Sequence, residues 1–522
     1  MGEIIDTLTW RSSFAGYVRH WAATQPDAPA VTVGAPDDAP DDTLAYGELD
    51  ALSSRVANAL GSLGVGPGGR VGHLGRNRIG YPALLYGASK QRATIVGLNW
   101  RFTARELMPL LADSAPAVIV VDDEFRATAE EAVAGSGIAT TLLSGDDVAA
   151  WAADDDTDPG TESQPDDVAL IFYTSGTTGV PKGAMLTAGS IANHLTRPTP
   201  WTMTPSSTVL VASPMFHTAG TGWLYLPGSC GSHCVVLRDP APAQILERLS
   251  RHRVTHTLLV PTVIRMILGA ADPASFDLSA LQTMAYGASP IPPALLARAI
   301  EAFGCEFVQA YGMTETGGPI CYLWPADHDP SVPGRLRSAG RPLDGVEVRI
   351  TDPETDEPCP VGEFGEVWTR SDQQMIGYLN RPEATAATVT PEGWLRTGDG
   401  GYADADGYVY LTDRLSDVIV TGAENVYPLE VENVLAAHAD VAEVSVIGVA
   451  DERWGETVIA VVVPRPGVAA DDDTAAALIA HAREHLAHYK APTRVEFVAE
   501  LPKNPAGKVL RRLLRQERAP KT

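Results

Sequence analysis

Apolar residues recur along the N-terminal part of the chain with two different spacings. The stretch YGELDALSSRVANALGSLGV, residues 46–65, places them at helical intervals and predicts an amphipathic helix. The stretches APAVIVVDD, residues 115–123, and DDVALIFYTSG, residues 166–176, are continuous apolar runs that end in turn residues, which is typical of buried strands. Strands that alternate with helices favour an α/β fold with largely parallel sheets.

The pattern changes near residue 339, where short β-rich runs are separated by glycine and proline turns and predict a β-subdomain. Farther on, we expect a helix over 429–438, strands over 441–450 and 457–464, and a helix over 475–487, which together form a small α+β domain. The sequence therefore predicts an N-terminal domain over 1–413 and a C-terminal domain over 414–522, with a hinge near 413–416.

Composition narrows the classes of function. With 522 residues the chain is long enough for several domains, and a formal net charge of −26 disfavours nucleic acid and anionic membranes as partners. The N-terminal region holds no long apolar run, so we expect no signal peptide, no membrane span and a cytoplasmic location.

Two local features leave alternatives open. The five cysteines include no C-x-x-C pair, so free thiols are expected; CGSHC, residues 230–234, is interpreted as strand packing, with half a metal site as the alternative. The acidic stretch DDDTDPGTESQPDD, residues 154–167, predicts a surface connection, either ordered or disordered.

The stretch YTSGTTGVPKG, residues 173–183, is the clearest candidate for chemistry. Its glycines and hydroxyl residues would let backbone N–H groups and hydroxyls converge on phosphate oxygens, and Lys182 adds a positive charge. It follows a predicted strand and precedes a predicted helix at SIANHL, residues 190–195. It is not a Walker loop, because Pro181 precedes the lysine and Gly183 follows it. A phosphate-binding loop is therefore the hypothesis, and a merely flexible turn is the alternative.

Four further stretches follow this loop in order: QAYGMTE (309–315), RTGD (396–399), TDRLSDVIVTGAENVYPLEVE (412–432) and PKNPAGK (502–508). Together with the loop, and over nearly the whole chain, they resemble the adenylate-forming superfamily of acyl-CoA ligases, nonribosomal peptide adenylation domains and luciferases. The resemblance implies an α/β fold with a large N-terminal domain of two αβ-layered subdomains plus a β-barrel. A small mobile α+β C-terminal domain would close over the active site.

The resemblance also implies an ATP- and Mg²⁺-dependent reaction in two steps. A carboxylate attacks the α-phosphate of ATP to give acyl-AMP and pyrophosphate, and a thiol then displaces AMP to give a thioester. Positive charge must screen the approach of the carboxylate to the polyphosphate. By resemblance, Lys508 bridges the carboxylate and the α-phosphate, Thr314 contacts the α-phosphate and Glu315 holds Mg²⁺.

The resemblance places ATP on three parts of the chain. The loop surrounds its β- and γ-phosphates, the YGAS segment (286–289) and Tyr311 enclose adenine, and Asp399 with Arg414 contacts the ribose. The nucleotide-binding residues are then Thr174, Ser175, Gly176, Thr177, Thr178, Lys182, Gly287, Ala288, Ser289, Tyr311, Asp399 and Arg414. As purely structural alternatives, Tyr311 belongs to the core, Asp399 stabilises its turn and Arg414 forms a surface ion pair.

The segment SPMFHTAGTGW, residues 213–223, bears on the acid. Amino-acid-activating relatives place an Asp here, so its absence favours an acid without an α-amino group. Small residues beside His217 and the apolar stretch 258–268 favour a hydrophobic fatty, aryl or bulky polycyclic acid. The expected acyl pocket comprises His217, Gly220, Gly222, Val260, Gly287 and Gly312. His217 is interpreted as a catalytic gate between this pocket and the thiol tunnel, and a hydrogen-bonded core histidine is the alternative.

CoA is the expected thiol, passing Gly422 and stacking its adenine on Trp454 of DERWGE, residues 451–456. A Trp454 that packs internally is the alternative. Ser416 stands where the family usually has Lys or Asp, and Ala423 stands in place of a second glycine. Adenylation is therefore better supported than thioester formation.

Three other functions share part of this pattern: an acyl-AMP ligase that loads an acyl carrier protein, a luciferase-like oxygenase and a non-catalytic nucleotide-binding scaffold. The presence of Lys182, Glu315 and Lys508 together speaks against the scaffold.

Overall fold

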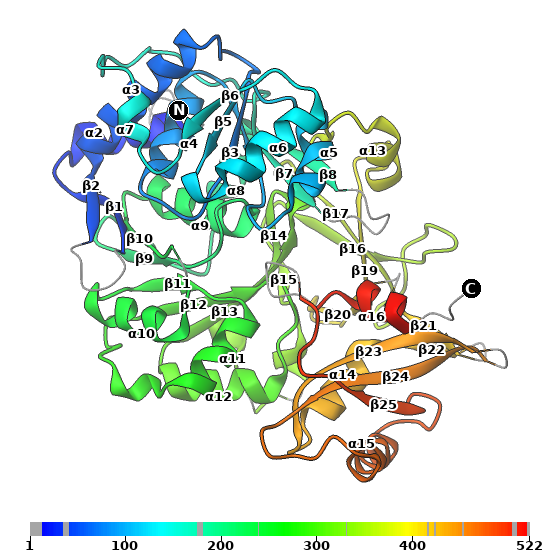
Figure 1. The fold of residues 1–522 in the computed structure, drawn as a ribbon. Coiled ribbons are helices and arrows are strands. Elements are labelled where there is room, and N and C mark those ends of the chain that lie inside the picture. The colour runs from blue at the N-terminus through cyan, green and yellow to red at the C-terminus, as the bar shows by residue number, and fades with distance from the viewer. Residues whose placement is uncertain are drawn as a thin grey trace.

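A computed structural model of the chain describes residues 13–34, 41–174, 181–238, 240–329, 331–332, 334–414, 417–421, 424–451, 454–503 and 509–518, apart from the side chains of residues 413, 414, 424 and 425. Figure 1 shows two layered lobes one above the other, with the C-terminal elements beside the lower lobe. Among the helices of these described residues, none combines the length and the apolar character that a membrane span needs.

A seven-stranded sheet forms the upper lobe in Figure 1. Its strands lie in the spatial order β18 (Gly377–Tyr378), β8 (Lys182–Thr187), β7 (Val168–Thr174), β4 (Thr94–Gly97), β3 (Arg70–Leu74), β5 (Val118–Val121) and β6 (Thr141–Ser144). Neighbours from β7 to β6 are parallel, whereas β8 pairs antiparallel with both β7 and β18. The parallel pairing predicted from the sequence is confirmed for the centre of this sheet.

A nine-stranded sheet forms the lower lobe. Its strands lie in the order β15 (Arg341–Pro342), β14 (Gly318–Leu323), β13 (Glu306–Met313), β12 (Thr283–Gly287), β11 (His256–Leu258), β9 (Thr208–Val211), β10 (His233–Val236), β1 (Pro29–Val33) and β2 (Asp42–Ala45). The strands from β13 to β1 are parallel, and the two ends of the sheet are antiparallel.

Helices pack on both faces of each sheet. They are α2 (Phe14–Thr24), α3 (Tyr46–Ser62), α4 (Gly80–Lys90), α5 (Ala104–Ser114), α6 (Arg126–Ser136), α7 (Val148–Trp151), α8 (Ala188–Leu195), α9 (Thr218–Ser229), α10 (Pro242–Arg251), α11 (Pro261–Ala270) and α12 (Pro293–Phe303). Short 3-10 turns are η2 (Asp123–Phe125), η3 (Pro273–Ser275), η4 (Thr314–Thr316), η5 (Pro325–Asp327) and η6 (Arg335–Arg337).

Successive side chains of a strand point to opposite faces of its sheet, so each central strand contributes apolar residues to a core on either face. Val71 of β3 and Val209 of β9 share one buried cluster with residues of α4 and α9, so these helices lie between the sheets. On the outer faces, Leu74 packs with α5 and α6, and Leu210 packs with α10, α11 and α12. The result is an alternating arrangement of three helical layers and two sheets, as the predicted αβ-layered subdomains require.

The β-rich region predicted after residue 339 is built on an antiparallel sheet of four strands. They are β16 (Glu347–Thr351), β17 (Gly365–Arg370), β19 (Leu395–Ala403) and β20 (Val409–Arg414), accompanied by α13 (Pro382–Thr388). A bridge between Gly340 and Val409 joins this sheet to the chain that enters it.

The C-terminal elements form a separate five-stranded sheet with its own apolar core. Its strands are β22 (Glu424–Val426), β21 (Ile419–Thr421), β24 (Gly455–Pro464), β23 (Val441–Asp451) and β25 (Arg494–Phe497), with helices α14 (Pro428–Ala436), α15 (Asp472–His485) and α16 (Arg511–Arg518). The helix predicted over 475–487 begins earlier because the Asp471 side chain accepts a hydrogen bond from the Thr474 amide and so caps the first turn.

The candidate phosphate loop has a different setting from the one predicted. It joins two antiparallel strands, because residues after Pro181 form β8 and pair with β7, with Thr174 opposite Lys182. The predicted helix follows only after β8, where the Thr187 side chain caps it by accepting from the Ser190 amide. The described residues on either side of the loop, Thr174 and Lys182, thus pair across two antiparallel strands.

Two open alternatives are resolved by the fold. The acidic stretch 154–167 is ordered, since Asp158 pairs with Arg19 at 2.6 Å and with the fully buried Lys90 at 3.0 Å. Cys234 is a buried residue of β10 with a free thiol, which agrees with strand packing.

Candidate functional site

The buried carboxylate of Glu315 is the centre of the candidate site. Glu315 lies in the turn η4 directly after β13 and is only 4% exposed. Its Oε1 accepts two hydrogen bonds, from the Thr174 hydroxyl at 3.0 Å and from the Tyr378 hydroxyl at 2.9 Å. The structure therefore joins the end of β7, the turn after β13 and the edge strand β18 at one carboxylate.

This carboxylate could hold a cation. Both of its hydrogen-bond partners are neutral hydroxyls, and within the described residues it forms no ion pair with a basic side chain. An uncompensated buried charge is costly, so a bound cation would relieve it. The described residues hold no group of three or more His, Cys, Asp or Glu side chains that could enclose a metal by themselves. One carboxylate fits Mg²⁺, which is usually held by one or two protein carboxylates together with substrate phosphates.

Positive charge lies next to this acid. Lys182 is the first residue of β8, and its Nζ lies 4.7 Å from the centroid of the Tyr378 ring. The hairpin register sets Thr174 and Lys182 opposite each other at the base of the loop. The remaining predicted members of this loop, Ser175, Gly176, Thr177 and Thr178, lie outside the described residues.

Thr314 connects this centre to the second large sheet. The Thr218 hydroxyl, in the first turn of α9, donates to the Thr314 hydroxyl at 3.1 Å. His217 is the residue that precedes α9. The expected α-phosphate contact and the expected acyl-pocket helix are therefore adjacent.

The predicted ribose and adenine residues also come together. The Tyr311 hydroxyl donates to Asp399 Oδ2 at 2.9 Å, and Asp399 on β19 is the cross-strand partner of Arg414 on β20. Burial, together with the nearby Asp399 charge, raises the pKa of Tyr311 well above its usual value, so Tyr311 is a proton donor. The side chain of Arg414 is not among those described.

The YGAS segment shows backbone strain where adenine is expected. Ala288 has a φ of 64°, in the left-handed region that non-glycine residues rarely adopt, and it is exposed directly after β12. Ser289 beside it is partly exposed. Strain of this kind persists only where the surrounding structure imposes it, and it is frequent at binding sites.

The glycines predicted to leave room for the acyl group differ in their surroundings. A Cβ at Gly287 would lie 2.3 Å from the Ala310 carbonyl oxygen, one at Gly312 2.3 Å from the Gly318 oxygen, and one at Gly220 2.1 Å from the Pro214 oxygen. Backbone packing therefore requires these glycines. At Gly222 the nearest atom would be the Tyr225 hydroxyl oxygen at 3.6 Å, an ordinary contact distance, so of the α9 glycines only this one leaves room for a Cβ.

His217 is neutral and lacks a partner on one nitrogen. Its Nε2 is buried and has no hydrogen-bond partner among the described residues. Burial, and then the charge of Arg101, lowers its pKa to about 4. The Nε2 atom therefore differs from that of a hydrogen-bonded core histidine. Val260, the last predicted pocket residue, is partly exposed and precedes α11.

Of the C-terminal residues predicted to act, Trp454 is described and is 48% exposed, so it does not pack internally. It precedes Gly455, the β24 residue that pairs with Thr421 next to the predicted tunnel position. Gly422 and Lys508 themselves lie outside the described residues. Lys503 and Val509, which flank the segment containing Lys508, form a bridge with each other.

Sequence reasoning missed Tyr378 and Thr218, which contact the two predicted residues Glu315 and Thr314. Thr218 lies within the segment 213–223 that the sequence assigns to the pocket, so its position directly after His217 could have identified it as a candidate site residue. Tyr378 belongs to a strand of two residues, which is too short to show periodicity.

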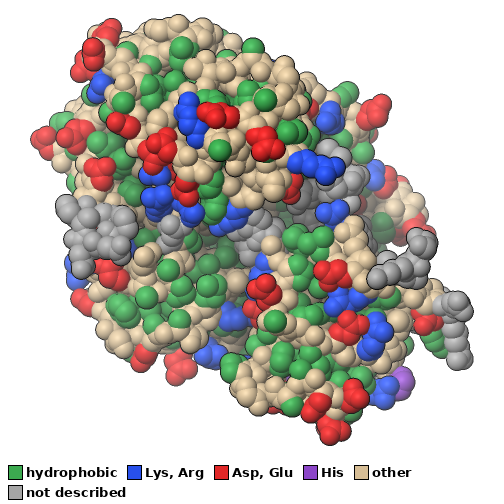
Figure 2. Space-filling view, viewed as in Figure 1, with side chains coloured by type: hydrophobic (Ala, Val, Ile, Leu, Met, Phe, Trp, Pro, Cys, Tyr) green, Lys and Arg blue, Asp and Glu red, His purple; other side chains and the backbone are tan. Residues whose placement is uncertain are grey.

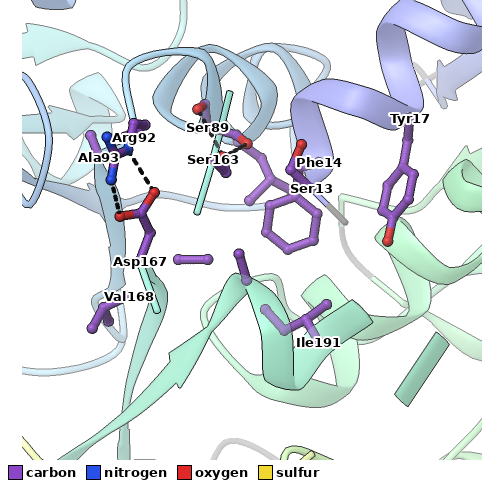
Figure 3. A pocket seen from close by; sticks show the side chains of 13 residues that line it. Ser13, Phe14, Tyr17, Ser89, Arg92, Ala93, Ser163, Asp167, Val168 and Ile191 are labelled. Atoms are coloured by element: carbon purple, nitrogen blue, oxygen red, sulfur yellow. Dashed lines mark hydrogen bonds and ion pairs between the residues drawn. The ribbon is translucent and has the colours of Figure 1, made fainter. Parts of the chain in front are cut away.

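The cavity in Figure 3 is separate from this site. It lies among α2, α4, β7 and α8, beside the ion pair of Arg92 and Asp167. Its volume of about 20 Å³ has room for one water molecule. It is a packing void rather than a substrate pocket.

Comparison with known proteins agrees with this arrangement. The family model described as AMP-binding enzyme matches residues 18–379, and the model for the AMP-binding enzyme C-terminal domain matches residues 430–508. A fatty acid–[acyl-carrier-protein] ligase from Streptomyces coeruleorubidus is 38% identical over 91% of both chains. A feruloyl-CoA synthase from an Amycolatopsis species is 39% identical, over 90% of this chain and 92% of that protein.

Among solved structures, an anthranilate CoA ligase in complex with anthranoyl-AMP superposes with a TM-score of 0.88 at 27% identity, over 97% of each chain. The match extends over both the large N-terminal part and the small C-terminal part. The chain belongs to the AMP-binding enzyme family, within its AMP-forming acyl-CoA synthetases, which activate a carboxylic acid as an acyl-adenylate.

Proposed function

We propose that this chain activates a hydrophobic carboxylic acid, of the fatty, aryl or bulky polycyclic class, and transfers its acyl group to CoA. In the first step a carboxylate oxygen bonds to the α-phosphorus of ATP and pyrophosphate leaves. In the second step the thiol sulfur bonds to the acyl carbon, the bond to AMP breaks, and the thiol proton is released.

The observation that carries this proposal is the contact set around Glu315. One buried carboxylate, one lysine and one threonine pair lie together at the junction of the two large sheets. Lys182 would screen the negative charge of the polyphosphate while the acid approaches. Thr314, fixed by Thr218, would contact the α-phosphate at the head of α9, where the acid enters.

Glu315 is the residue that would hold Mg²⁺, and when bound the ion would neutralise part of the polyphosphate charge. Asp399 would accept hydrogen bonds from the ribose hydroxyls, with Tyr311 fixing the orientation of its carboxylate. Adenine would lie against the strained segment at Ala288.

The class of acid is inferred from the neutral lining of α9. Burial lowers the pKa of His217 to about 4, so it carries no charge at neutral pH, and Gly222 on the following helix leaves room for a Cβ. A neutral pocket disfavours a substrate ammonium group and favours apolar acids.

Gly222→Leu tests this pocket. We expect kcat/KM for bulky acids to fall about ten-fold or more while small acids are spared, because a leucine here would extend into the pocket that Gly222 is proposed to line. The measurement is kcat/KM over acids of graded size. Gly269→Leu is the matched control, since Gly269 is also a helical glycine, and a Cβ there would have no atom within 4 Å. Equal losses for small and bulky acids would remove Gly222 from the pocket.

An acceptor with phosphate groups is supported by the basic side chains at the pocket entrance. Figure 2 shows Lys and Arg side chains gathered along the hollow between the two lobes. The Arg76 and Arg101 guanidinium groups lie 4.3 Å and 4.1 Å from the Trp100 ring centroid, and Arg101 acts electrostatically on His217. Arg76 also pairs with Glu124 at 2.9 Å, so on a chain with net charge −26 Arg101 is the stronger candidate of the two for attracting an anionic acceptor.

Trp454→Ala tests the CoA assignment. If the exposed indole stacks on the adenine of CoA, its removal should raise the KM for CoA roughly five-fold or more and leave the KM for ATP unchanged. Trp324, which is 41% exposed, supplies the matched control as Trp324→Ala. An unchanged CoA dependence would exclude Trp454 from the CoA site.

We further propose that residues 414–522 rotate as a unit about a hinge near 413–416 and bring Lys508 to the α-phosphate for the first step. Gly422 would then line the thiol tunnel in the second step. Ser416 and Ala423 are the positions where this chain departs from the family, and their effect would fall on the second step.

A carrier protein is the second candidate acceptor, because a relative 38% identical to this chain is a fatty acid–[acyl-carrier-protein] ligase. The deciding experiment incubates the chain with ATP, Mg²⁺ and an acid panel, with CoA or with a phosphopantetheinylated carrier protein, and identifies products by mass. Acyl-CoA supports the proposal. Acyl-AMP that persists with CoA but is consumed by the carrier protein would replace it with the second candidate.

A further inference from the structure

The segment QQMIGY, residues 373–378, clamps the turn that carries Glu315. The fully buried side chain of Gln373 donates to the Thr316 oxygen at 3.1 Å and to the Pro319 oxygen at 2.9 Å. The Met375 amide donates to the Glu315 carbonyl oxygen at 2.9 Å. Three hydrogen bonds therefore fix the backbone at the acid and in the residues that follow it.

The last residue of the segment, Tyr378, reaches the charged groups themselves. It lies in β18 opposite Ala184 of β8 and is 5% exposed. Its hydroxyl donates to Glu315 Oε1 at 2.9 Å, and its ring faces the Lys182 ammonium at 4.7 Å. One aromatic side chain thus contacts both the acid and the base of the site through two different groups.

Glu315 and Lys182 form no ion pair with each other, although each contacts Tyr378. A direct ion pair would satisfy both charges and leave neither for a ligand. The hydroxyl stabilises the carboxylate by a charge-assisted hydrogen bond, and the ring face attracts the ammonium through its quadrupole. Thr174 donates to the same oxygen, which leaves Glu315 Oε2 without these two donors.

We propose that Tyr378 is a positioning residue that keeps the opposite charges of Glu315 and Lys182 apart and oriented, so that the carboxylate stays available to the divalent cation and the ammonium to the polyphosphate. This inference rests on the proposed function of the site. It assigns to the aromatic ring and to the hydroxyl two separable effects.

The test is equilibrium binding without turnover. Mn²⁺ serves as the probe, detected by electron paramagnetic resonance, in the presence of a non-hydrolysable ATP analogue and without acid. Tyr378→Phe should weaken Mn²⁺ binding roughly ten- to a hundred-fold, the usual cost of losing a group that orients a metal ligand. Binding of the analogue in the absence of metal should stay unchanged, because the ring is retained. Tyr378→Leu should weaken both.

The matched control is Tyr410→Phe, which removes a tyrosine hydroxyl donated to a carboxylate, Asp404, at 3.1 Å in the β-subdomain. It should bind Mn²⁺ like the wild type. If Tyr378→Phe proves poorly folded by thermal unfolding, Thr174→Val removes the other donor on Glu315 Oε1 and must lower Mn²⁺ affinity.

The outcomes distinguish a failure of the positioning role of Tyr378 from a failure of the proposed function. Wild-type affinity for Mn²⁺ in Tyr378→Phe, or in Thr174→Val where that variant is needed, overturns the positioning role and leaves the proposed function intact. A wild-type chain that binds neither the analogue nor Mn²⁺ contradicts the proposed function itself.

Discussion

Replacing Lys508 with alanine is expected to slow acyl-AMP formation by about two to three orders of magnitude while leaving thioester formation from supplied acyl-AMP largely intact. The lysine would bridge the incoming carboxylate and the α-phosphate only when both are in place, so its charge stabilises the transition state of the first step alone. The measurement is single-turnover acyl-AMP formation, compared with CoA-dependent consumption of synthetic acyl-AMP.

Lys503→Ala is the matched control for this result. Lys503 lies at the start of the same C-terminal segment and pairs with Glu443 at 2.7 Å, away from the candidate site. Its replacement should change neither step appreciably, because an ion pair this close to the surface contributes little. Equal losses of both steps in Lys508→Ala would contradict the assigned role, because they would indicate a general disturbance of the C-terminal domain.

Replacing Glu315 with glutamine is expected to reduce adenylation roughly a hundred-fold or more, since even groups that only orient metal ligands contribute up to about that factor. The same change should leave the melting temperature equal or higher. It removes a buried charge that lacks a basic partner among the described residues, while keeping an oxygen for the Thr174 and Tyr378 hydroxyls. Activity and thermal unfolding are measured on the same preparation.

Opposite changes in activity and stability distinguish a functional acid from a structural one. Glu347→Gln is the control, because Glu347 pairs with Arg370 at 2.8 Å on the exposed side of the β-subdomain and should affect activity little. A melting temperature that falls strongly in Glu315→Gln would show that the carboxylate serves the fold, and the account of the site would need revision.

Much of the layered fold follows from local sequence. The apolar run of β7 and the amphipathic stretch of α3 were recognisable because burial on both faces or on one face leaves a distinct period. The segment KGAMLT was not recognised as β8, since its pairing with β7 depends on the hairpin rather than on its own pattern.

The candidate site was predictable as a set of segments but not as a set of contacts. Tyr378 reaches Glu315 only because β18 pairs with β8, an edge contact between residues nearly two hundred positions apart in the chain. The surroundings of the glycines were likewise not predictable from the sequence. Gly220 and Gly222 look equivalent in sequence, yet Gly220 is held against the Pro214 oxygen, whereas Gly222 leaves room for a Cβ.

The most direct test of the central claim is acid-dependent exchange of radiolabelled pyrophosphate into ATP by the wild-type chain, without CoA, across fatty, aryl and polycyclic acids. We expect exchange that requires both an acid of one of these classes and Mg²⁺, and that is lost in Glu315→Gln. ATP binding without exchange for any of these acids would contradict it and would favour a nucleotide-binding scaffold.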